Sequence, residues 1–179
     1  WSTNLQTPLI ITPHPGEMSR LLGIDIDSIQ KNRLETALSY ATHINGVVVL
    51  KGAGTIIASP DGRARISEFA SPVLAKGGTG DILAGIISGL VAQNVEPFEA
   101  ASLGVYLHAD MGRRVAENYG TASGIAQDLL KVMPTSRKML DGIETSIIDT
   151  FGRNSLFPDT IKQGQSEEQF MTDLTHNLD

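Results

Sequence analysis

The sequence lacks cysteine, long apolar runs and any excess of basic residues, and each absence excludes a class of protein. Without cysteine among its 179 residues the chain has no disulfide framework, no thiol nucleophile and no thiolate metal site. No apolar run approaches the roughly 20 residues that a membrane-spanning helix needs. These absences predict a cytoplasmic protein that has no membrane partner.

The charge of the chain is unevenly placed. Residues 140–179 hold eight acidic and two basic side chains, which leaves 12 of each over residues 1–139. Neither part has the basic stripe of a nucleic-acid binder, so we expect no nucleic-acid partner. The shift in composition predicts a folded domain over residues 1–139 and an acidic tail over 140–179 that is either helical or disordered.

What the sequence does contain is a glycine-rich segment, Lys76–Asp81, that leads into an apolar helix. Its glycines allow close approach of the backbone to a ligand, and the N-terminus of a helix presents unpaired N–H groups to an anion. Asp81 falls in the first turn, where a carboxylate can contact a substrate hydroxyl. This is the layout of a phosphoryl-transfer site, although the spacing matches neither a Walker A loop nor a Rossmann fingerprint. The alternative is that Thr79 or Asp81 only caps the helix.

Two further turns lie where open α/β folds place ligands. Lys51–Thr55 follows the apolar strand 47–50, and its glycines can form a nest of N–H groups at the sheet edge. The alternative is a tight turn between two strands. His14 lies between Pro13 and Pro15, which restrain the backbone and aim the ring, although a structural role remains open. The other histidines share no metal-ligand spacing, so no protein-built metal site is predicted.

Apolar periodicity predicts alternating strands and helices. Strands are expected near residues 9–12, 47–50, 55–59 and 65–67. Helices are expected near 17–22, 27–44, 81–93, 97–118 and 123–132, with Asp27 or Ser28 capping the second and Pro134 closing the last. The strand–helix–strand order at the N-terminal end predicts a βαβ unit, and the strands at 55–59 and 65–67 predict a hairpin. The fold class is therefore α/β, with a mainly parallel sheet flanked by helices.

These motifs together resemble one known family. In their order and separations, the segments Thr12–Glu17, Lys51–Thr55 and Gly78–Gly85 resemble the NAD(P)H-hydrate dehydratases, which are ribokinase-like proteins that repair hydrated nicotinamide cofactors. The resemblance extends to about residue 134 and implies that the chain is the C-terminal portion of that domain, without a companion epimerase domain. One departure is that Phe69–Val73 replaces the family's usual Gly-Asn-Pro-Gly approach to the glycine loop.

The resemblance implies that the protein is a lyase. It implies ADP- or ATP-dependent dehydration of the S form of hydrated NADH or NADPH, in which the C6 hydroxyl is phosphorylated and phosphate then leaves, with Mg²⁺ accompanying the nucleotide. By motif match, Asp81 is the catalytic base, and the hydrated cofactor contacts His14 and Asp81. The nucleotide contacts Lys51, Gly52, Ala53, Gly54, Thr55 and Gly80. The transferring phosphoryl group is stabilised by the amides of Gly78, Thr79 and Gly80.

Two other interpretations stay open. A ribokinase-like small-molecule kinase, of the hydroxymethylpyrimidine or hydroxyethylthiazole type, shares the Gly-Thr-Gly-Asp device. A nucleotide-binding fragment without catalysis is the second alternative. Because a parallel sheet needs cover on both faces, the partial domain is also expected to form a homo-oligomer and to have weak activity alone.

Overall fold

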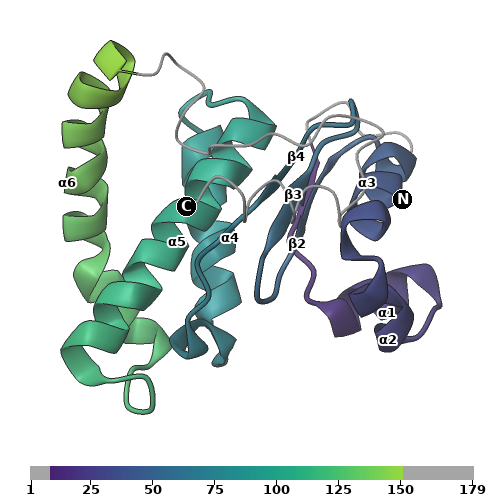
Figure 1. Ribbon diagram of the computed structural model, residues 1–179, viewed down its shortest axis with the longest axis horizontal. Coiled ribbons are helices and arrows are strands. Elements are labelled where there is room, and N and C mark those ends of the chain that lie inside the picture. The colour runs from purple at the N-terminus through teal and green to yellow at the C-terminus, as the bar shows by residue number, and fades with distance from the viewer. Residues whose placement is uncertain (1–8, 151–179) are drawn as a thin grey trace, which may run out of the picture.

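The computed structural model describes residues 9–150, except for the side chains of residues 139 and 141–150 (Figure 1). Its elements in chain order are β1 (Ile10–Ile11), α1 (Pro15–Leu22), α2 (Ile26–Lys31), α3 (Arg33–Ile44), β2 (Val47–Leu50), β3 (Ile56–Ala58), β4 (Ala64–Ile66), the 3₁₀ helix η1 (Pro72–Ala75), α4 (Thr79–Val91), α5 (Pro97–Tyr119) and α6 (Ala126–Thr150). No helix in this part of the chain combines the length and the apolar character that crossing a membrane would require.

The four described strands form one sheet in the order β1-β2-β3-β4. β1 is parallel to β2, whereas β2–β3 and β3–β4 are antiparallel. The predicted βαβ unit and hairpin are therefore confirmed, but the described sheet is mixed rather than mainly parallel. The reason is connection length: three helices join β1 to β2, while the short loops after β2 and β3 can only turn the chain back.

Helices cover both faces of this sheet, as Figure 1 shows. Successive side chains of a strand point to opposite faces, so the wholly apolar β2 contributes to two cores. Val48 and Leu50 pack in a cluster with residues of α1, α2 and α3, and Val47 and Val49 pack with residues of α4 and α5. All four side chains are buried, which explains why β2 reads as a continuous apolar run.

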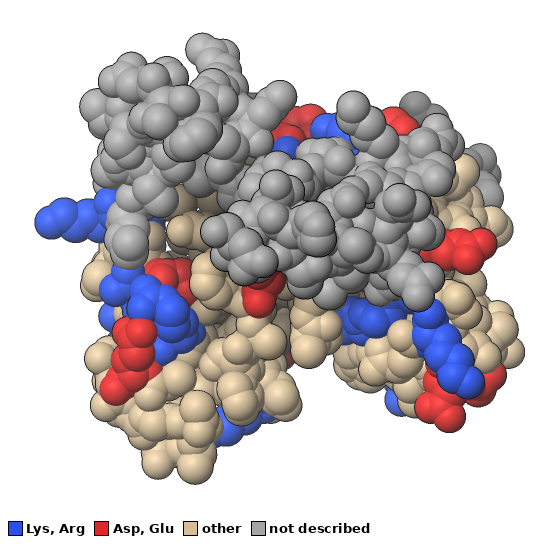
Figure 2. All heavy atoms as spheres, in the orientation of Figure 1, with Lys and Arg blue, Asp and Glu red and all other residues tan. Residues whose placement is uncertain are grey.

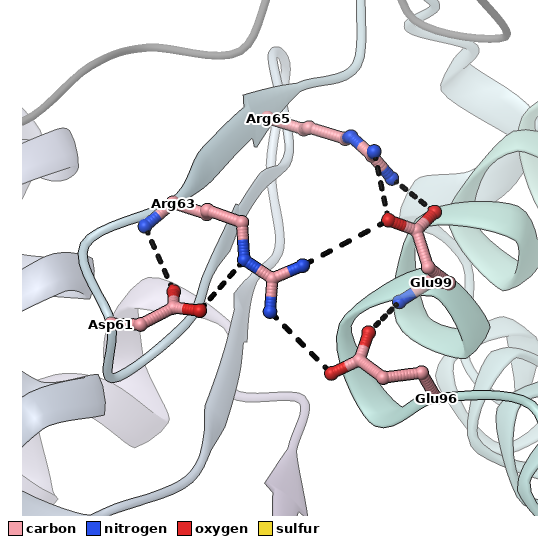
Figure 3. Close-up of polar contacts among 5 residues, drawn as sticks. All are labelled: Asp61, Arg63, Arg65, Glu96 and Glu99. Atoms are coloured by element: carbon pink, nitrogen blue, oxygen red, sulfur yellow. Dashed lines mark hydrogen bonds and ion pairs between the residues drawn. The ribbon is translucent and has the colours of Figure 1, made fainter. Parts of the chain in front are cut away.

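The hairpin β3–β4 is tied to the start of α5 by an ion-pair cluster (Figure 3). Arg65 donates from both terminal nitrogens to the Glu99 carboxylate, at 2.7 and 2.9 Å. Arg63 pairs with Asp61 at 2.8 Å and lies 3.5 Å from Glu96, the N-cap residue of α5. Both guanidinium groups also lie over the ring of buried Phe98. The cluster thus fixes α5 against the sheet.

Two helix boundaries differ from those that the sequence predicts. The predicted helix 27–44 is two helices, because the backbone at Asn32 leaves the helical region, and α2 is capped by Asp25 rather than by Asp27 or Ser28. α6 does not close at Pro134 but continues to Thr150. Buried residues on both sides of the proline, Val132 and Ser136, hold the helix in register despite the hydrogen bond that proline cannot donate.

α6 crosses the predicted boundary between a domain over 1–139 and an acidic tail over 140–179. It packs on α5 and η1 through a third buried cluster, Val73, Met111, Val115, Leu129 and Val132. Most of the predicted tail, residues 151–179, lies outside the described residues, so the boundary remains a prediction.

Candidate functional site

The N-terminus of α4 is built by the glycine-rich segment. Gly78 is the N-cap residue with a left-handed backbone (φ 85°), and no side chain caps the helix. The Thr79 hydroxyl lies instead within hydrogen-bonding distance of the carbonyls of Leu74 and Lys76, at 2.7 and 2.8 Å. Asp81 is in the first turn, exposed, and makes no hydrogen bond or ion pair with any described residue. A capping role for Thr79 or Asp81 is therefore wrong.

This helix end leaves backbone donors available to a ligand. The Thr79 N–H is directed to the Lys76 carbonyl at 3.4 Å, whereas the N–H groups of Gly78 and Gly80 donate to no described residue. Unpaired N–H groups and the positive end of the helix dipole favour an anion. The predicted anion site at Gly78, Thr79 and Gly80 thus has two open donors and one weakly engaged donor.

The loop Lys51–Thr55 joins β2 to β3, so the turn between two strands is confirmed. Gly54 has a left-handed backbone (φ 66°), and the Thr55 hydroxyl donates to the Gly52 carbonyl at 3.0 Å. The turn nevertheless leaves the N–H groups of Ala53, Gly54 and Thr55 without a partner among the described residues. Consecutive free amides are what an anion-binding nest requires, so the turn and the nest are compatible.

Lys51 brings the three motif segments together. Its N–H donates to the Pro13 carbonyl at 2.8 Å, because parallel pairing places the ends of β1 and β2 side by side. Its Nζ lies 3.6 Å from the Glu17 carboxylate, and a Cβ added to Gly80 would lie 3.0 Å from the same Nζ. The ammonium group therefore lies between the start of α1 and the start of α4.

His14 has a structural role in this arrangement. It is the N-cap residue of α1: its Nδ1 accepts from the N–H groups of Gly16 (3.0 Å) and Glu17 (3.2 Å), and Glu17 accepts from the His14 N–H at 2.7 Å. Because Nδ1 accepts, the neutral ring carries its proton on Nε2, and the ring is half exposed. The structural alternative for His14 is confirmed, and substrate contact through Nε2 remains a prediction.

Glu17 lies beside His14 and Lys51, although no role is predicted for it from the sequence. Partial burial raises its pKa, but the His14 N–H and the charge of Lys51 outweigh that effect, so the pKa lies below its ordinary value. Its position three residues after the cap, where a capping-box acid stands, was the available sequence signal.

His108 is a second residue of this region for which the sequence predicts no role. It lies in α5 and only 7% of it is exposed. Burial lowers its pKa to about 4, a bond with the Thr79 backbone offsets part of that effect, and the charge of Lys51 adds to it. His108 is therefore a neutral imidazole packed behind the start of α4.

The described residues contain no group of three or more histidine, cysteine or acidic side chains that could hold a metal ion. A shallow groove of about 450 Å³ borders the start of α1 and is lined by Ile11, Thr12, Pro13, Glu17, Arg20 and Leu21. Where described residues are visible in Figure 2, basic side chains lie among acidic ones.

Comparison of the sequence with known proteins identifies its family. The family model described as NAD(P)H-hydrate dehydratase matches residues 2–135. The bifunctional NAD(P)H-hydrate repair enzyme Nnr of Moorella thermoacetica is 45% identical over 82% of this chain and 28% of its own length. The ADP-dependent (S)-NAD(P)H-hydrate dehydratase of Bacillus subtilis is 38% identical over 71% of this chain and 46% of its own length.

A solved structure agrees with the sequence matches. The ADP/ATP-dependent NAD(P)H-hydrate dehydratase of Bacillus subtilis, co-crystallised with ATP/Mg²⁺, superposes with a TM-score of 0.71 and 37% identity, covering 74% of this chain and 48% of that one. The ribokinase-like α/β fold that the sequence predicts is thereby confirmed. The chain spans less than half the length of these relatives.

Proposed function

Because the chain belongs to the NAD(P)H-hydrate dehydratase family, we propose that it serves the ADP- or ATP-dependent dehydration of (S)-hydrated NADH and NADPH. The observation that carries the proposal is the meeting of the three motif segments around Lys51, beside two sets of backbone donors that are unpaired among the described residues. One set belongs to the β2–β3 loop and the other to the start of α4.

The residues present fit an adenine nucleotide. The N–H groups of Ala53, Gly54 and Thr55, which have no partner in the described part of the chain, can hold phosphate oxygens, with Gly52 completing the loop. Lys51 supplies one positive charge beside Gly80, where a side chain would crowd the ammonium group. A divalent cation would arrive with the phosphates, since the described residues offer no cage of their own for Mg²⁺.

Asp81 and the helix start would act on the second substrate. The bound nucleotide would supply the phosphoryl group for the C6 hydroxyl of the hydrate. Asp81 is exposed and free of described partners, so its carboxylate can accept the hydrogen bond of that hydroxyl and orient it. The carboxylate could serve as an orienting group or as a base acting in the transition state. The amides of Gly78, Thr79 and Gly80 would face the transferring group, and His14 Nε2 would donate to the hydrate.

One set of incubations tests the proposal against its alternatives. The protein is incubated with hydrated NADH and ADP or ATP, and the absorbance of the reduced ring is followed. Its rise supports the dehydratase. Phosphorylation of hydroxymethylpyrimidine or hydroxyethylthiazole, with the hydrate untouched, would identify a kinase instead. Binding of ADP without turnover of any of these compounds would identify a nucleotide-binding fragment.

Three further features belong to the same proposal. We expect a cytoplasmic protein, a homo-oligomer, and no nucleic-acid or membrane partner. Light scattering on the purified chain measures the oligomeric state, and a monomer at all concentrations would contradict that part.

A further inference from the structure

Arg33 is the first residue of α3, directly after the break at Asn32, and its guanidinium group reaches the β2–β3 loop. Nη2 donates to the carbonyls of Leu50 and Gly54, both at 3.1 Å, while Nη1 donates to the Gln30 side chain at 2.9 Å. The two carbonyls lie at opposite ends of the loop. One nitrogen of Arg33 therefore clamps the loop at both ends.

Gly52 shows how closely the loop lies against this group. A Cβ added to Gly52 would lie 2.8 Å from Nη1 and 2.9 Å from Nη2 of Arg33, closer than such atoms approach in proteins. The backbone of Gly52 (φ 153°) also lies in a region that other residues rarely adopt. Only glycine allows the loop to rest on the guanidinium group in this way.

The clamp decides which way the loop amides point. In a trans peptide the N–H points opposite to the C=O. The Leu50–Lys51 peptide is held from both sides, by Arg33 at its carbonyl and by the Pro13 carbonyl at its N–H. The Gly54–Thr55 peptide is held at its carbonyl only, so the N–H of Thr55 is directed away from α3 and stays unpaired among the described residues.

We propose that Arg33 is a positioning residue for phosphate binding by the Lys51–Thr55 loop. It fixes the carbonyls of Leu50 and Gly54 toward α3, which turns the Thr55 amide outward toward the phosphates of an adenine nucleotide. Its positive charge, placed behind the loop, favours an anion in front of it. Lysine would replace it only in part, because one ammonium group could reach the two carbonyls but lacks the second nitrogen, which bonds Gln30 and lies beside Gly52. The inference rests on the proposed function for the identity of the ligand.

The first test compares Arg33→Met with Arg33→Lys and with Arg137→Met, which removes the charge of an exposed arginine on α6. ADP–Mg and adenosine are titrated calorimetrically into each protein, and circular dichroism checks the fold. We expect Arg33→Met to weaken the affinity for ADP at least about tenfold while the affinity for adenosine is unchanged. Arg33→Lys should recover only part of the ADP affinity, and the Arg137→Met control should match wild type. If folded Arg33→Met binds ADP as tightly as wild type does, the inference is overturned.

A second measurement does not depend on the ligand. Hydrogen exchange of the Lys51 and Gly52 amides, which donate to the Pro13 carbonyl and to the Thr55 hydroxyl oxygen, is compared in apo wild type and in the folded Arg33 variants, and faster exchange of these two amides supports the clamp. Gly52→Ala is then made with and without Arg33→Met. Because Arg33→Met should relieve the clash with the new Cβ, the effects of the two substitutions on the free energy of unfolding should not be additive. Unchanged exchange together with additive effects refutes the clamp. If wild type does not bind ADP but exchange still differs between wild type and the Arg33 variants, only the proposed function is refuted.

Discussion

Substitution of His108 by leucine should change how the stability of the protein depends on pH. In the folded chain burial lowers the pKa of His108 to about 4, whereas the ordinary value is 6.5. Between these pH values the unfolded chain binds the proton and the folded chain does not. The free energy of unfolding therefore rises with pH across this window. The stability that depends on neutral His108 is fully present above pH 6.5 and is lost as the pH falls toward 4.

The expected magnitude follows from the two pKa values. Their difference corresponds to about 3 kcal/mol over the whole window and to about 2 kcal/mol between pH 7 and pH 4.5. At pH 7 we expect His108→Leu to change the free energy of unfolding little. The lost bond with the Thr79 backbone, about 1 kcal/mol, is offset by removal of the buried Nε2, which has no hydrogen-bond partner among the described residues. At the lower pH the variant should be more stable than wild type by about 2 kcal/mol.

Urea unfolding of both proteins near pH 7 and near pH 4.5, followed by circular dichroism, measures this difference. His43→Leu is the matched control, since it removes an exposed histidine from α3 and leaves His108 in place. If wild type and His108→Leu lose the same stability on acidification, the buried neutral imidazole is the wrong description of this position.

Three further predictions concern the site and the hairpin. Asp81→Asn should lower turnover by roughly 10²–10⁴-fold and leave calorimetric ADP affinity intact, because only the basic carboxylate is removed; wild-type rates would exclude the assigned role. Gly54→Val should weaken ADP binding more than Lys51→Ala does, since valine is strained at φ 66° and the loop binds through its amides. The reverse order of affinities would make Lys51 the main anchor. Glu99→Gln should lower the free energy of unfolding by about 1 kcal/mol in urea, because it weakens the paired bonds from Arg65. An unchanged free energy of unfolding at low salt would show that stacking of Arg65 on Phe98 is enough to hold the hairpin against α5.

The sequence by itself determined the local elements of the fold. Glycine spacing marked the turn at Lys51–Thr55 and the start of α4, and the apolar run at Val47–Leu50 marked a strand buried on both faces. Short loops with turn residues marked the hairpin. These features depend on residues that are neighbours in the chain, so local conformational preferences are enough to reveal them.

Tertiary packing decided what those preferences left open. The helix α6 passes Pro134 because buried contacts on both sides outweigh the local cost, and the helix break at Asn32 places Arg33 beneath the loop. His108 is buried behind Thr79 by helix packing that no spacing in the sequence reveals. Arg33 meets Gly54 across 21 positions of sequence, and only the folded chain brings such distant groups within bonding distance. The glycines and the aspartate of the candidate site could therefore be proposed from sequence. The residues that hold them in place required the structure, because their partners are set by the fold and not by local spacing.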